Sequence, residues 1–494
     1  MTYSLKTPQR PLLWSDTILD LRDFLTDDTT PVYIVGGAVR DAFLQRPLND
    51  IDLATPENAV ALGRRIANSI NGDFYIMDAE RDVARVILNT TFEGRVVIDI
   101  ARLRGADIVT DLQDRDFTFN AMAVDLKGDM SQLIDPLEGE SDLIKRIIRQ
   151  CSAHAITDDP VRALRGIRQS IQFKARIEPE TLASIRAIRS DLLNTSPERI
   201  RDELFKLLGL PNPVSALRIA DKLGLLGIVL PEIIALHDYQ YPAINQRDLW
   251  EHSLLVSEKL QGVLRTISPF RTDETAAVFD LGMIVMSLDR YRQQLQAHID
   301  DELSEGRARW RVLLLAALLH DTGKTQSDIS PEDALNHSAE LVAKRAEALR
   351  LSNAEKQLLV KVVRNHTQPL NLQRNSKRDM HRYWYTLGET GVSVILLALA
   401  DYLGTVGFEI KQDEWVKILE HARTLLAAFY DHHDEIVSPT MLVDGNALME
   451  KLNLEPGPMI GELLDAIREE QAVGEITTED EALTFASNFL QDKR

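Results

Sequence analysis

Three aspartates in short apolar runs have the type and spacing to hold a divalent cation. Asp50 and Asp52 alternate in the run NDIDL, so on a strand they project from the same side of the chain. Asp99 lies in the apolar run VVIDIA, where a buried or half-buried acid requires a partner. Such oxygen donors suit Mg²⁺, which keeps waters and substrate phosphates in its remaining positions. We predict that Asp50, Asp52 and Asp99 are catalytic, with Asp50 and Asp52 as ligands of Mg²⁺ ions that activate a hydroxyl and stabilise a leaving pyrophosphate.

A glycine pair upstream of these aspartates has the position of a phosphate-binding turn. The predicted strand PVYIV runs into Gly36 and Gly37, and the following AVRDAFL predicts a helix. Backbone N–H groups at such a turn can approach a triphosphate, and the helix N-terminus and the Arg40 guanidinium add positive charge. The same pattern also occurs at plain tight turns, so it gains weight only from the aspartates nearby.

A second group of residues, far along the chain, combines histidines with aspartates on predicted apolar helices. The group comprises His252, His320, Asp321, His337, His366 and Asp401. A lone histidine on an apolar face is usually a core residue, but a set of imidazoles and carboxylates suits a transition metal such as Mn, Fe, Co, Ni or Zn. We predict that these residues hold a metal centre, with enough donors for two ions.

The elements that must position these residues change type along the chain. Short apolar runs alternate with helical stretches, such as residues 58–70, which predicts a mixed head. After Cys151 we expect no further strands, and helical periodicity continues to the C-terminus. The predicted fold is an α+β head followed by an all-α body. We divide the chain into an N-terminal extension (1–30), the head (31–150), a helical neck (151–240), a helical metal-binding domain (241–405) and a helical tail (406–494).

Charge and cysteine content limit the partners and the compartment. The 494 residues carry a formal net charge of −20, which by itself argues against binding to nucleic acid. Residues 145–206, however, hold 13 Lys or Arg against 8 Asp or Glu, so this stretch is +5 while the rest of the chain is −25. A local basic strip of this kind can bind RNA, although a solvated helix face looks the same. The single cysteine, the lack of a signal peptide and the lack of a membrane-length apolar run predict a cytoplasmic protein without a membrane, and no obligate protein partner is evident.

The motifs of the head resemble those of a known family. The run GGAVRDAFLQRPLNDIDLAT resembles the signature of the class II nucleotidyltransferases, which include the bacterial CCA-adding enzymes and poly(A) polymerases. Residues 111–123 are similar to the family's second motif, and residues 135–149 and the run ERIRDEL (198–204) resemble the family as well. The resemblance implies nucleotide binding by Gly36, Gly37, Arg40, Arg115, Asp116 and Asn120.

Residues 158–168 resemble the family's nucleotide-selecting helix, except that the usual opening Glu-Asp is Asp-Asp here. Asp159 and Arg162 are three residues apart and therefore share one helix face. A carboxylate only accepts hydrogen bonds and a guanidinium only donates them, which fits the Watson–Crick edges of cytosine and adenine and opposes those of uracil and guanine. Arg165 and Arg168, further along the helix, suit phosphate. An amphipathic helix with ion pairs is the alternative.

The order His252, His320-Asp321, Asp401 resembles the HD superfamily of metal-dependent phosphohydrolases over about residues 248–405, and Gly323-Lys324 after the His-Asp pair fits it too. In that family the metals hold a hydroxide that attacks a phosphate ester. In some CCA-adding enzymes such a domain acts on 2′,3′-cyclic or terminal phosphates. The resemblance therefore makes the metal-binding domain an HD domain with an expected phosphohydrolase activity.

The expected function is template-independent addition of CCA to the tRNA 3′ end from CTP and ATP. A poly(A) polymerase, or an enzyme that adds only CC or only A, shares nearly all of these motifs. The acidic C-terminal half lacks the basic tail expected of a poly(A) polymerase, which favours CCA addition. An HD hydrolase whose head only binds RNA is a further alternative, but a binding module has no need of Asp50, Asp52 and Asp99.

Overall fold

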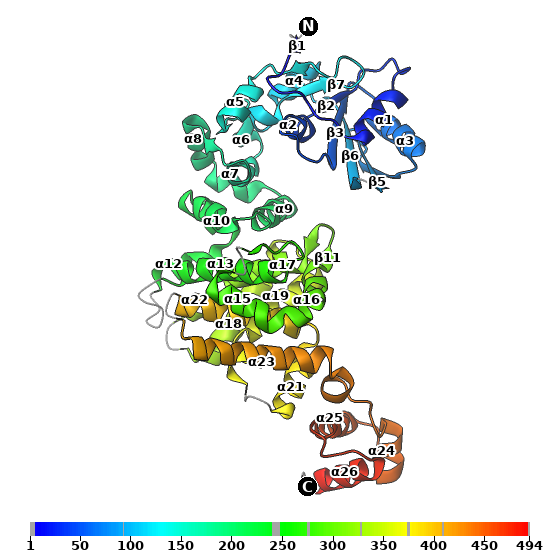
Figure 1. Cartoon of the computed structure of the whole chain (residues 1–494), viewed down its shortest axis with the longest axis vertical. Coiled ribbons are helices and arrows are strands. Elements are labelled where there is room, and N and C mark those ends of the chain that lie inside the picture. The colour runs from blue at the N-terminus through cyan, green and yellow to red at the C-terminus, as the bar shows by residue number, and fades with distance from the viewer. Residues whose placement is uncertain are drawn as a thin grey trace. The chain divides into compact units, whose positions relative to one another are not determined.

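The computed structural model describes residues 5–91, 93–239, 248–273, 277–326, 329–372, 376–407 and 410–492. It separates into two compact units, residues 1–229 and residues 230–494. The first unit contains the mixed head and the neck, and the second is helical (Figure 1).

The head is built on one eight-stranded sheet with the order β1-β8-β7-β2-β3-β6-β5-β4. Its strands are β1 (Leu5–Lys6), β2 (Tyr33–Val35), β3 (Asp50–Thr55), β4 (Asp73–Asp78), β5 (Val83–Thr90), β6 (Gly94–Arg102), β7 (Ala123–Asp125) and β8 (Leu133–Ile134). β3 and β6 run parallel, whereas the other neighbouring strands are antiparallel. The predicted mixed head is confirmed.

Helices α1 (Asp16–Phe24), α2 (Gly37–Phe43) and α3 (Ala59–Ile70) share a core with the sheet (Figure 1). The helix predicted over residues 58–70 is thus present. Alternate residues of β6 are buried, as period-two patterning requires. Ile18 and Leu21 of α1 lie in the same core, so residues of the predicted N-terminal extension pack into the head.

The neck continues the first unit as short helices. They are α6 (Ala155–Asp158), α7 (Arg162–Gln172), α8 (Pro179–Ala187), α9 (Pro197–Leu208), α10 (Pro213–Lys222) and α11 (Leu226–Val229). Two further helices, α4 (Ile108–Gln113) and α5 (Gly139–Lys145), belong to the head. Proline in the first turn starts α8, α9 and α10, because its fixed φ suits a helix and its missing N–H has no partner there.

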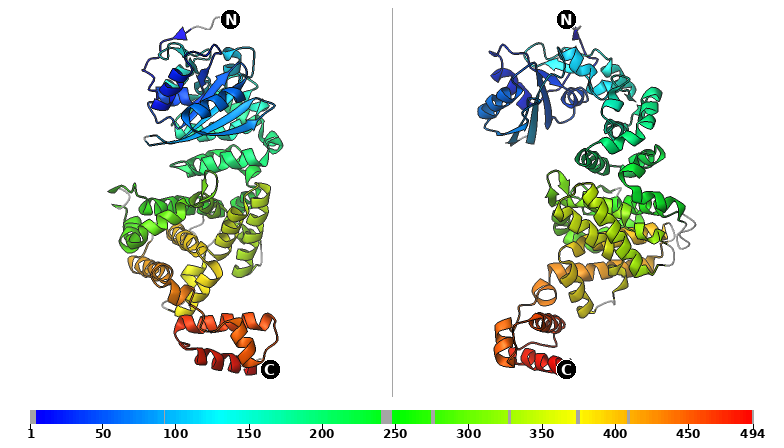
Figure 2. Two further views of the ribbon diagram at one scale, coloured as in Figure 1. Left: turned by 90° about the vertical axis from the view of Figure 1, so that its right-hand side faces the viewer. Right: turned by 180° about the vertical axis from the view of Figure 1, so that it is seen from behind.

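The second unit is a helical body (Figure 2). Its helices are α12 (Ile234–Asp238), α13 (Leu249–Ile267), α15 (Phe279–Leu288), α16 (Arg292–Asp300), α17 (Arg309–Leu319), α18 (Pro331–Ala348), α19 (Asn353–Asn365), α20 (Gln368–Asn371), α21 (Lys377–Leu387), α22 (Thr390–Val406), α23 (Gln412–Tyr430), α24 (Gly445–Leu452), α25 (Pro458–Val473) and α26 (Glu479–Asp492). α17 and α22 are buried on nearly every side, and α24 to α26 share a small core of their own. Within the described ranges, no single helix is long and apolar enough to cross a membrane, while the pair α21 and α22, bent by 110°, passes that test by length and composition only.

The expectation that no strands follow Cys151 is wrong in two places. β10 (Arg176–Ile177) pairs with β9 (Ile147–Ile148), and β11 (Glu302–Ser304) pairs with β12 (Arg307–Ala308). These strands have two or three residues, which is too short for an alternating pattern to appear in a sequence.

Candidate active site and candidate metal centre

The turn between β2 and α2 requires a glycine at position 36, both because of its backbone conformation and because a side chain there has no room. Gly36 precedes α2 with a φ of +70°, a conformation that L side chains rarely adopt. A Cβ atom on Gly36 would lie 2.9 Å from Nη1 of Arg115 and 3.3 Å from Oδ2 of Asp52. The turn therefore places the backbone of Gly36 close both to Asp52 and to Arg115 of the second motif.

Replacing Gly36 by Ala should destabilise the head by at least about 1–2 kcal/mol, because the left-handed backbone conformation becomes strained. Hydrogen–deuterium exchange of head peptides measures the loss. Gly37→Ala is the matched control, since its Cβ would meet nothing closer than 3.4 Å, at Nη2 of Arg40. Equal exchange in the two variants would contradict this role of the turn.

The three predicted carboxylates lie on the parallel strands β3 and β6. Asp52 is in register with Asp99, and Asp50 with Val97. Burial raises the pKa of Asp52; the Arg115 charge opposes this rise, and the Asp99 charge adds to it. Carboxylates on adjacent strands, with Asp52 desolvated, fit a divalent cation.

Asp99 differs from the other two in its partner. The Arg85 guanidinium donates to both of its oxygens, at 2.8 and 2.9 Å. In the part of the chain that the structure describes, groups of three donors close enough to share one ion occur only in the helical unit. The role of Asp99 beside Asp50 and Asp52 stays a prediction, with Arg85 as the partner of Asp99 in this structure.

A cavity of about 440 Å³ collects the other predicted residues of the head and neck. Its lining includes Gly36, Gly37, Arg40, Asp50, Asp52, Arg115, Asp116, Asn120, Asp159, Arg162, Arg165 and Arg168, and not Asp99. Five more lining residues were not assigned a role from the sequence, namely Arg104, Gln169, Gln172, Arg199 and Lys206, and Asp41 completes the set. The lining holds eight Arg or Lys against five Asp, so its net positive charge suits a triphosphate.

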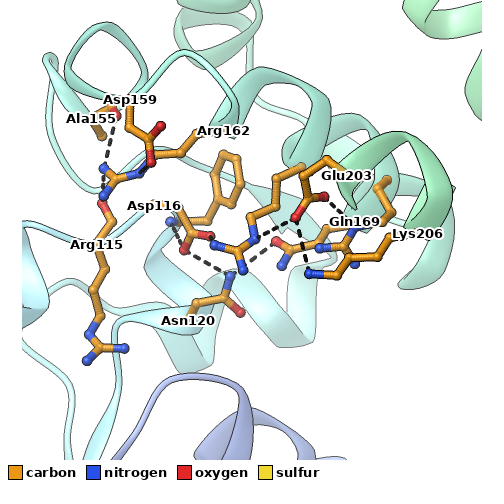
Figure 3. A network of polar contacts seen from close by, with 12 residues as sticks. Arg115, Asp116, Asn120, Ala155, Asp159, Arg162, Gln169, Glu203 and Lys206 are labelled. Atoms are coloured by element: carbon orange, nitrogen blue, oxygen red, sulfur yellow. Dashed lines mark hydrogen bonds and ion pairs between the residues drawn. The ribbon is translucent and has the colours of Figure 1, made fainter. Parts of the chain in front are cut away.

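Polar contacts connect the second motif to α7 (Figure 3). The Asn120 amide donates to Asp116 at 3.0 Å and to Gln169 at 3.1 Å, and its oxygen accepts from Arg40 at 2.5 Å. Burial alone would raise the pKa of Asp116, but the Arg165 charge and the Asn120 hydrogen bond hold that pKa below its usual value. Asp116 is therefore a fixed anion in the cavity wall.

Glu203 of α9 anchors the phosphate-side cations of α7 (Figure 3). It is buried, accepts from Nε of Arg168 at 2.8 Å, and lies 3.6 Å from Nε of Arg165 and 3.8 Å from Nζ of Lys206. The negative charge of Glu203 therefore holds Arg165 and Arg168, the two side chains that are predicted to suit phosphate. Nothing in the helical periodicity of ERIRDEL distinguishes this buried acid from a solvated one.

The second predicted constellation also assembles, inside the helical unit. Nε2 of His252 on α13 lies 3.1 Å from Oδ1 of Asp401 on α22. Nε2 of His320, after α17, lies 3.3 Å from Oδ2 of Asp321 and 3.5 Å from Oδ1 of Asp401. Nε2 of His366, after α19, lies 3.7 Å from Oδ1 of Asp321. Five of the six predicted ligands thus converge.

The unsatisfied atoms of this cluster fit a metal ion. Nδ1 of His320 and Nδ1 of His366 each lie 2.8 Å from a backbone carbonyl of the preceding turn, which leaves Nε2 as the free lone pair. Both Nε2 atoms and Oδ1 of Asp321 are buried without a hydrogen-bond partner. Mixed imidazole and carboxylate donors are those of a transition-metal site.

His337 is outside this cluster. Its imidazole on α18 is 35% exposed, and Nδ1 lies 3.9 Å from Oε2 of Glu340. The groups of donors within 4.8 Å of one another, among the described residues, do not include it. Gly323 of the predicted motif serves packing, since a Cβ there would lie 2.2 Å from the Ala334 carbonyl oxygen, while Nζ of Lys324 lies 2.7 Å from Oδ2 of Asp321.

Three family models match the chain. The model described as "Poly A polymerase head domain" matches residues 32–149, "Probable RNA and SrmB- binding site of polymerase A" matches residues 176–236, and "tRNA nucleotidyltransferase domain 2 putative" matches residues 333–486. The last match crosses the boundary predicted at residue 405.

Full-length relatives agree with these matches. The chain is 29% identical over 453 residues to the CC-adding tRNA nucleotidyltransferase of Geobacter sulfurreducens, covering 92% of this chain and 90% of the relative. It is 28% identical over 473 residues to the A-adding tRNA nucleotidyltransferase of Deinococcus radiodurans, covering 93% and 95%. A solved complex of a CCA-adding enzyme with ATP shares the fold, with a TM-score of 0.62 at 21% identity, covering 97% of this chain and 96% of that chain.

A head of the poly(A) polymerase type, with its glycine turn and aspartates at a cationic cavity, places the protein among the nucleotidyltransferases. With the segments that follow the head, the chain belongs to the class II tRNA nucleotidyltransferase family, which includes the CCA-adding enzymes.

Proposed function

We propose that the protein completes tRNA 3′ ends with CTP and ATP, without a nucleic-acid template. The observation that carries this proposal is that Asp159 and Arg162 line the same cavity as Asp50 and Asp52. A nucleotide whose base contacts Asp159 and Arg162 can therefore place its triphosphate near Asp50 and Asp52. The names of the two relatives support transfer to tRNA and keep CC-only and A-only addition as the competing outcomes.

Asp50 and Asp52 are the residues of the head that would hold Mg²⁺. Held by these two carboxylates, Mg²⁺ would supply neutralising charge for the triphosphate and Lewis-acid activation of the RNA 3′-hydroxyl. The chain's own contribution is positional: Arg40, Arg165 and Arg168 surround the phosphates with charge, and the backbone at Gly36 leaves room for them. Pyrophosphate leaves as the new phosphodiester forms.

Base choice follows from hydrogen-bond polarity at Asp159 and Arg162. Asp159 lines the cavity, so its carboxylate can accept from the amino group that cytosine and adenine share. A guanidinium N–H donates to the neighbouring ring nitrogen. Uracil and guanine present an acceptor and a donor in the opposite places, which leaves the protein's groups unpaired.

Arg162→Ala should lower kcat/KM for CTP and for ATP by a factor that corresponds to about 1–3 kcal/mol, because the substitution leaves a desolvated partner unpaired. Discrimination against UTP and GTP should fall at the same time. Steady-state kinetics with each nucleotide measures both effects. Arg186→Gln, an exposed arginine of α8, is the control, and unchanged discrimination in Arg162→Ala would move base reading to other residues.

The competing additions are separated with three tRNA transcripts that end before the first C, before the second C and before the A. Each transcript receives one nucleotide at a time, and the products are sequenced. CCA addition predicts CTP use by the first two transcripts and ATP use by the third. Stopping after CC, acting only on the third transcript, or adding a run of A would each identify one alternative.

We further propose that residues 241–405 of the helical unit form an HD domain and a metal-dependent phosphohydrolase. The supporting observation is the convergence of three imidazoles and two carboxylates with unsatisfied donor atoms. A transition metal held by His252, His320, Asp321, His366 and Asp401 would supply a nucleophile from water. The expected substrates are 2′,3′-cyclic or terminal phosphates on RNA ends, whose removal leaves an end that the head can extend.

A further inference from the structure

Arg104 is the one cationic side chain of the cavity lining for which the described residues provide no acidic partner. The other cations that line the cavity each lie within ion-pair distance of an Asp or Glu, and they are Arg40, Arg115, Arg162, Arg165, Arg168, Arg199 and Lys206. The guanidinium of Arg104 donates instead to a neutral group, the Asp114 carbonyl oxygen, which lies 3.3 Å from its Nη1. Arg104 is exposed, so its positive charge is accessible to a ligand in the cavity.

A buried acid fixes the backbone of Arg104 in the loop between β6 and α4. Oδ1 of Asp111 accepts from the backbone N–H of Arg104 at 3.1 Å, and its Oδ2 accepts from Nε and Nη2 of Arg115 at 3.0 and 2.9 Å. Asp111 itself is 2% exposed. The next residue of the loop, Gly105, packs closely on α4, since a Cβ atom there would lie 2.4 Å from Cγ2 of Thr110. Asp111 thus places Arg104 beside Arg115 while it contacts only the backbone of Arg104.

Three guanidinium groups therefore lie close together in this part of the cavity wall. Nη1 of Arg104 and Nη2 of Arg162 donate to the same oxygen, the Asp114 carbonyl, at 3.3 and 3.0 Å. Arg162 also donates to the Arg115 carbonyl oxygen at 3.2 Å (Figure 3). Desolvation at the cavity wall lowers the pKa of Arg104, and the charges of Arg115 and Arg162 lower it further. Like charges at this spacing repel one another, and a bound anion would relieve the repulsion.

The chemistry of the proposed reaction offers a phosphate group for this position. A guanidinium holds phosphate through charge-assisted hydrogen bonds. Phosphate enters the cavity from two sources, namely the triphosphate of the incoming nucleotide and the backbone at the RNA 3′ end. We infer that Arg104 is a substrate-binding residue that holds a phosphate group during nucleotide transfer. The inference rests on the proposed nucleotidyltransferase function, and neither the sequence motifs nor that proposal gives Arg104 a role.

Arg104→Gln removes the charge and keeps a polar side chain of similar reach. One of two Michaelis constants should rise about tenfold, as the loss of one charge-assisted hydrogen bond implies, with kcat nearly unchanged. A higher KM for CTP and ATP identifies the triphosphate as the ligand, and a higher KM for the RNA identifies the RNA backbone. The preference for CTP and ATP over UTP and GTP should stay as in the wild type, because every nucleotide carries the same phosphates. Arg104→Lys should recover part of the loss, since lysine keeps the charge.

Arg102→Gln is the matched control, because Arg102 is an exposed arginine at the end of β6 that does not line the cavity. It should keep both Michaelis constants of the wild type. Arg104→Gln should also unfold at the wild-type temperature, followed by circular dichroism, since Arg104 is exposed and forms no ion pair with the described residues. If Arg104→Gln does not fold, Arg104→Ala takes its place in the comparison.

Direct binding measurements separate this inference from the proposed function. Isothermal titration calorimetry with Mg²⁺ present measures the affinity for inorganic pyrophosphate and for a tRNA transcript that ends in CCA, and neither measurement needs nucleotide transfer. One of the two affinities should be about tenfold lower in Arg104→Gln than in the wild type. Wild-type affinities for both probes together with wild-type KM values in Arg104→Gln would overturn the inference. A change in base preference alone would make Arg104 a base-reading residue and overturn it too. If the wild type binds both probes but adds no nucleotide, the proposed function fails, and the two affinities still decide the inference.

Discussion

Replacing Asp50 or Asp52 by Ala should abolish nucleotide addition to tRNA while the head stays folded. Both carboxylates line the cavity, and burial raises the pKa of Asp52. Under the proposed assignment, removing either carboxylate would leave Mg²⁺ with too few ligands to support transfer. Extension of a tRNA that lacks its 3′ end, followed on a sequencing gel, measures the loss.

Asp73→Ala is the matched control for these variants, because Asp73 is an exposed acid of β4 in the same sheet. It should extend tRNA like the wild type. Asp99→Ala should be less damaging than Asp50→Ala or Asp52→Ala, since Asp99 is paired with Arg85 and does not line the cavity. Incorporation of even a few per cent by both Asp50→Ala and Asp52→Ala would contradict their assignment as the metal ligands.

The variant His320→Ala/Asp321→Ala should lose both the bound transition metal and the hydrolysis of RNA ends that carry a 2′,3′-cyclic or terminal phosphate. These two side chains are buried at the centre of the cluster, and each contributes a donor atom without a hydrogen-bond partner. Metal analysis of the purified protein and hydrolysis of 2′,3′-cyclic nucleotides are the measurements.

His337→Ala is the control for that variant, since its imidazole lies outside the ligand cluster. It should keep the metal and the activity. Nucleotide addition to a tRNA with a free 3′-hydroxyl should survive in both variants, because Asp50 and Asp52 belong to the other unit. If metal content and hydrolysis are the same in the double variant and the wild type, the cluster is a set of core residues.

The head was predictable where local patterns carry the information. The glycines of the β2–α2 turn, the alternation of Asp50 and Asp52, and the helix over residues 58–70 are features of neighbouring residues, and the structure places them as expected. The alternation fixes which side of a strand an acid occupies, and a Gly with positive φ fixes where the backbone turns.

The features of the site that could not be predicted from the sequence depend on contacts between distant segments. Arg104, Arg199 and Lys206 reach the cavity from a loop and from α9, and no spacing in the sequence signals this. Asp99 has the expected register beside Asp52, yet the cross-strand neighbour Arg85 takes both of its oxygens. His337 lies on a helix of the same unit but is partly exposed, which a residue pattern alone does not show.

The most direct test of the account is the sequence that the wild-type protein adds to a tRNA transcript lacking its 3′ end when all four nucleotides are supplied together. Polarity at Asp159 and Arg162 predicts that only C and A are added, as CCA or as the CC or A part of it, with no template present. Insertion of U or G at these positions, or the absence of any addition both to this transcript and to one that lacks only the final A, with Mg²⁺ supplied, would contradict the assignment of the cavity as a selective nucleotidyltransferase site.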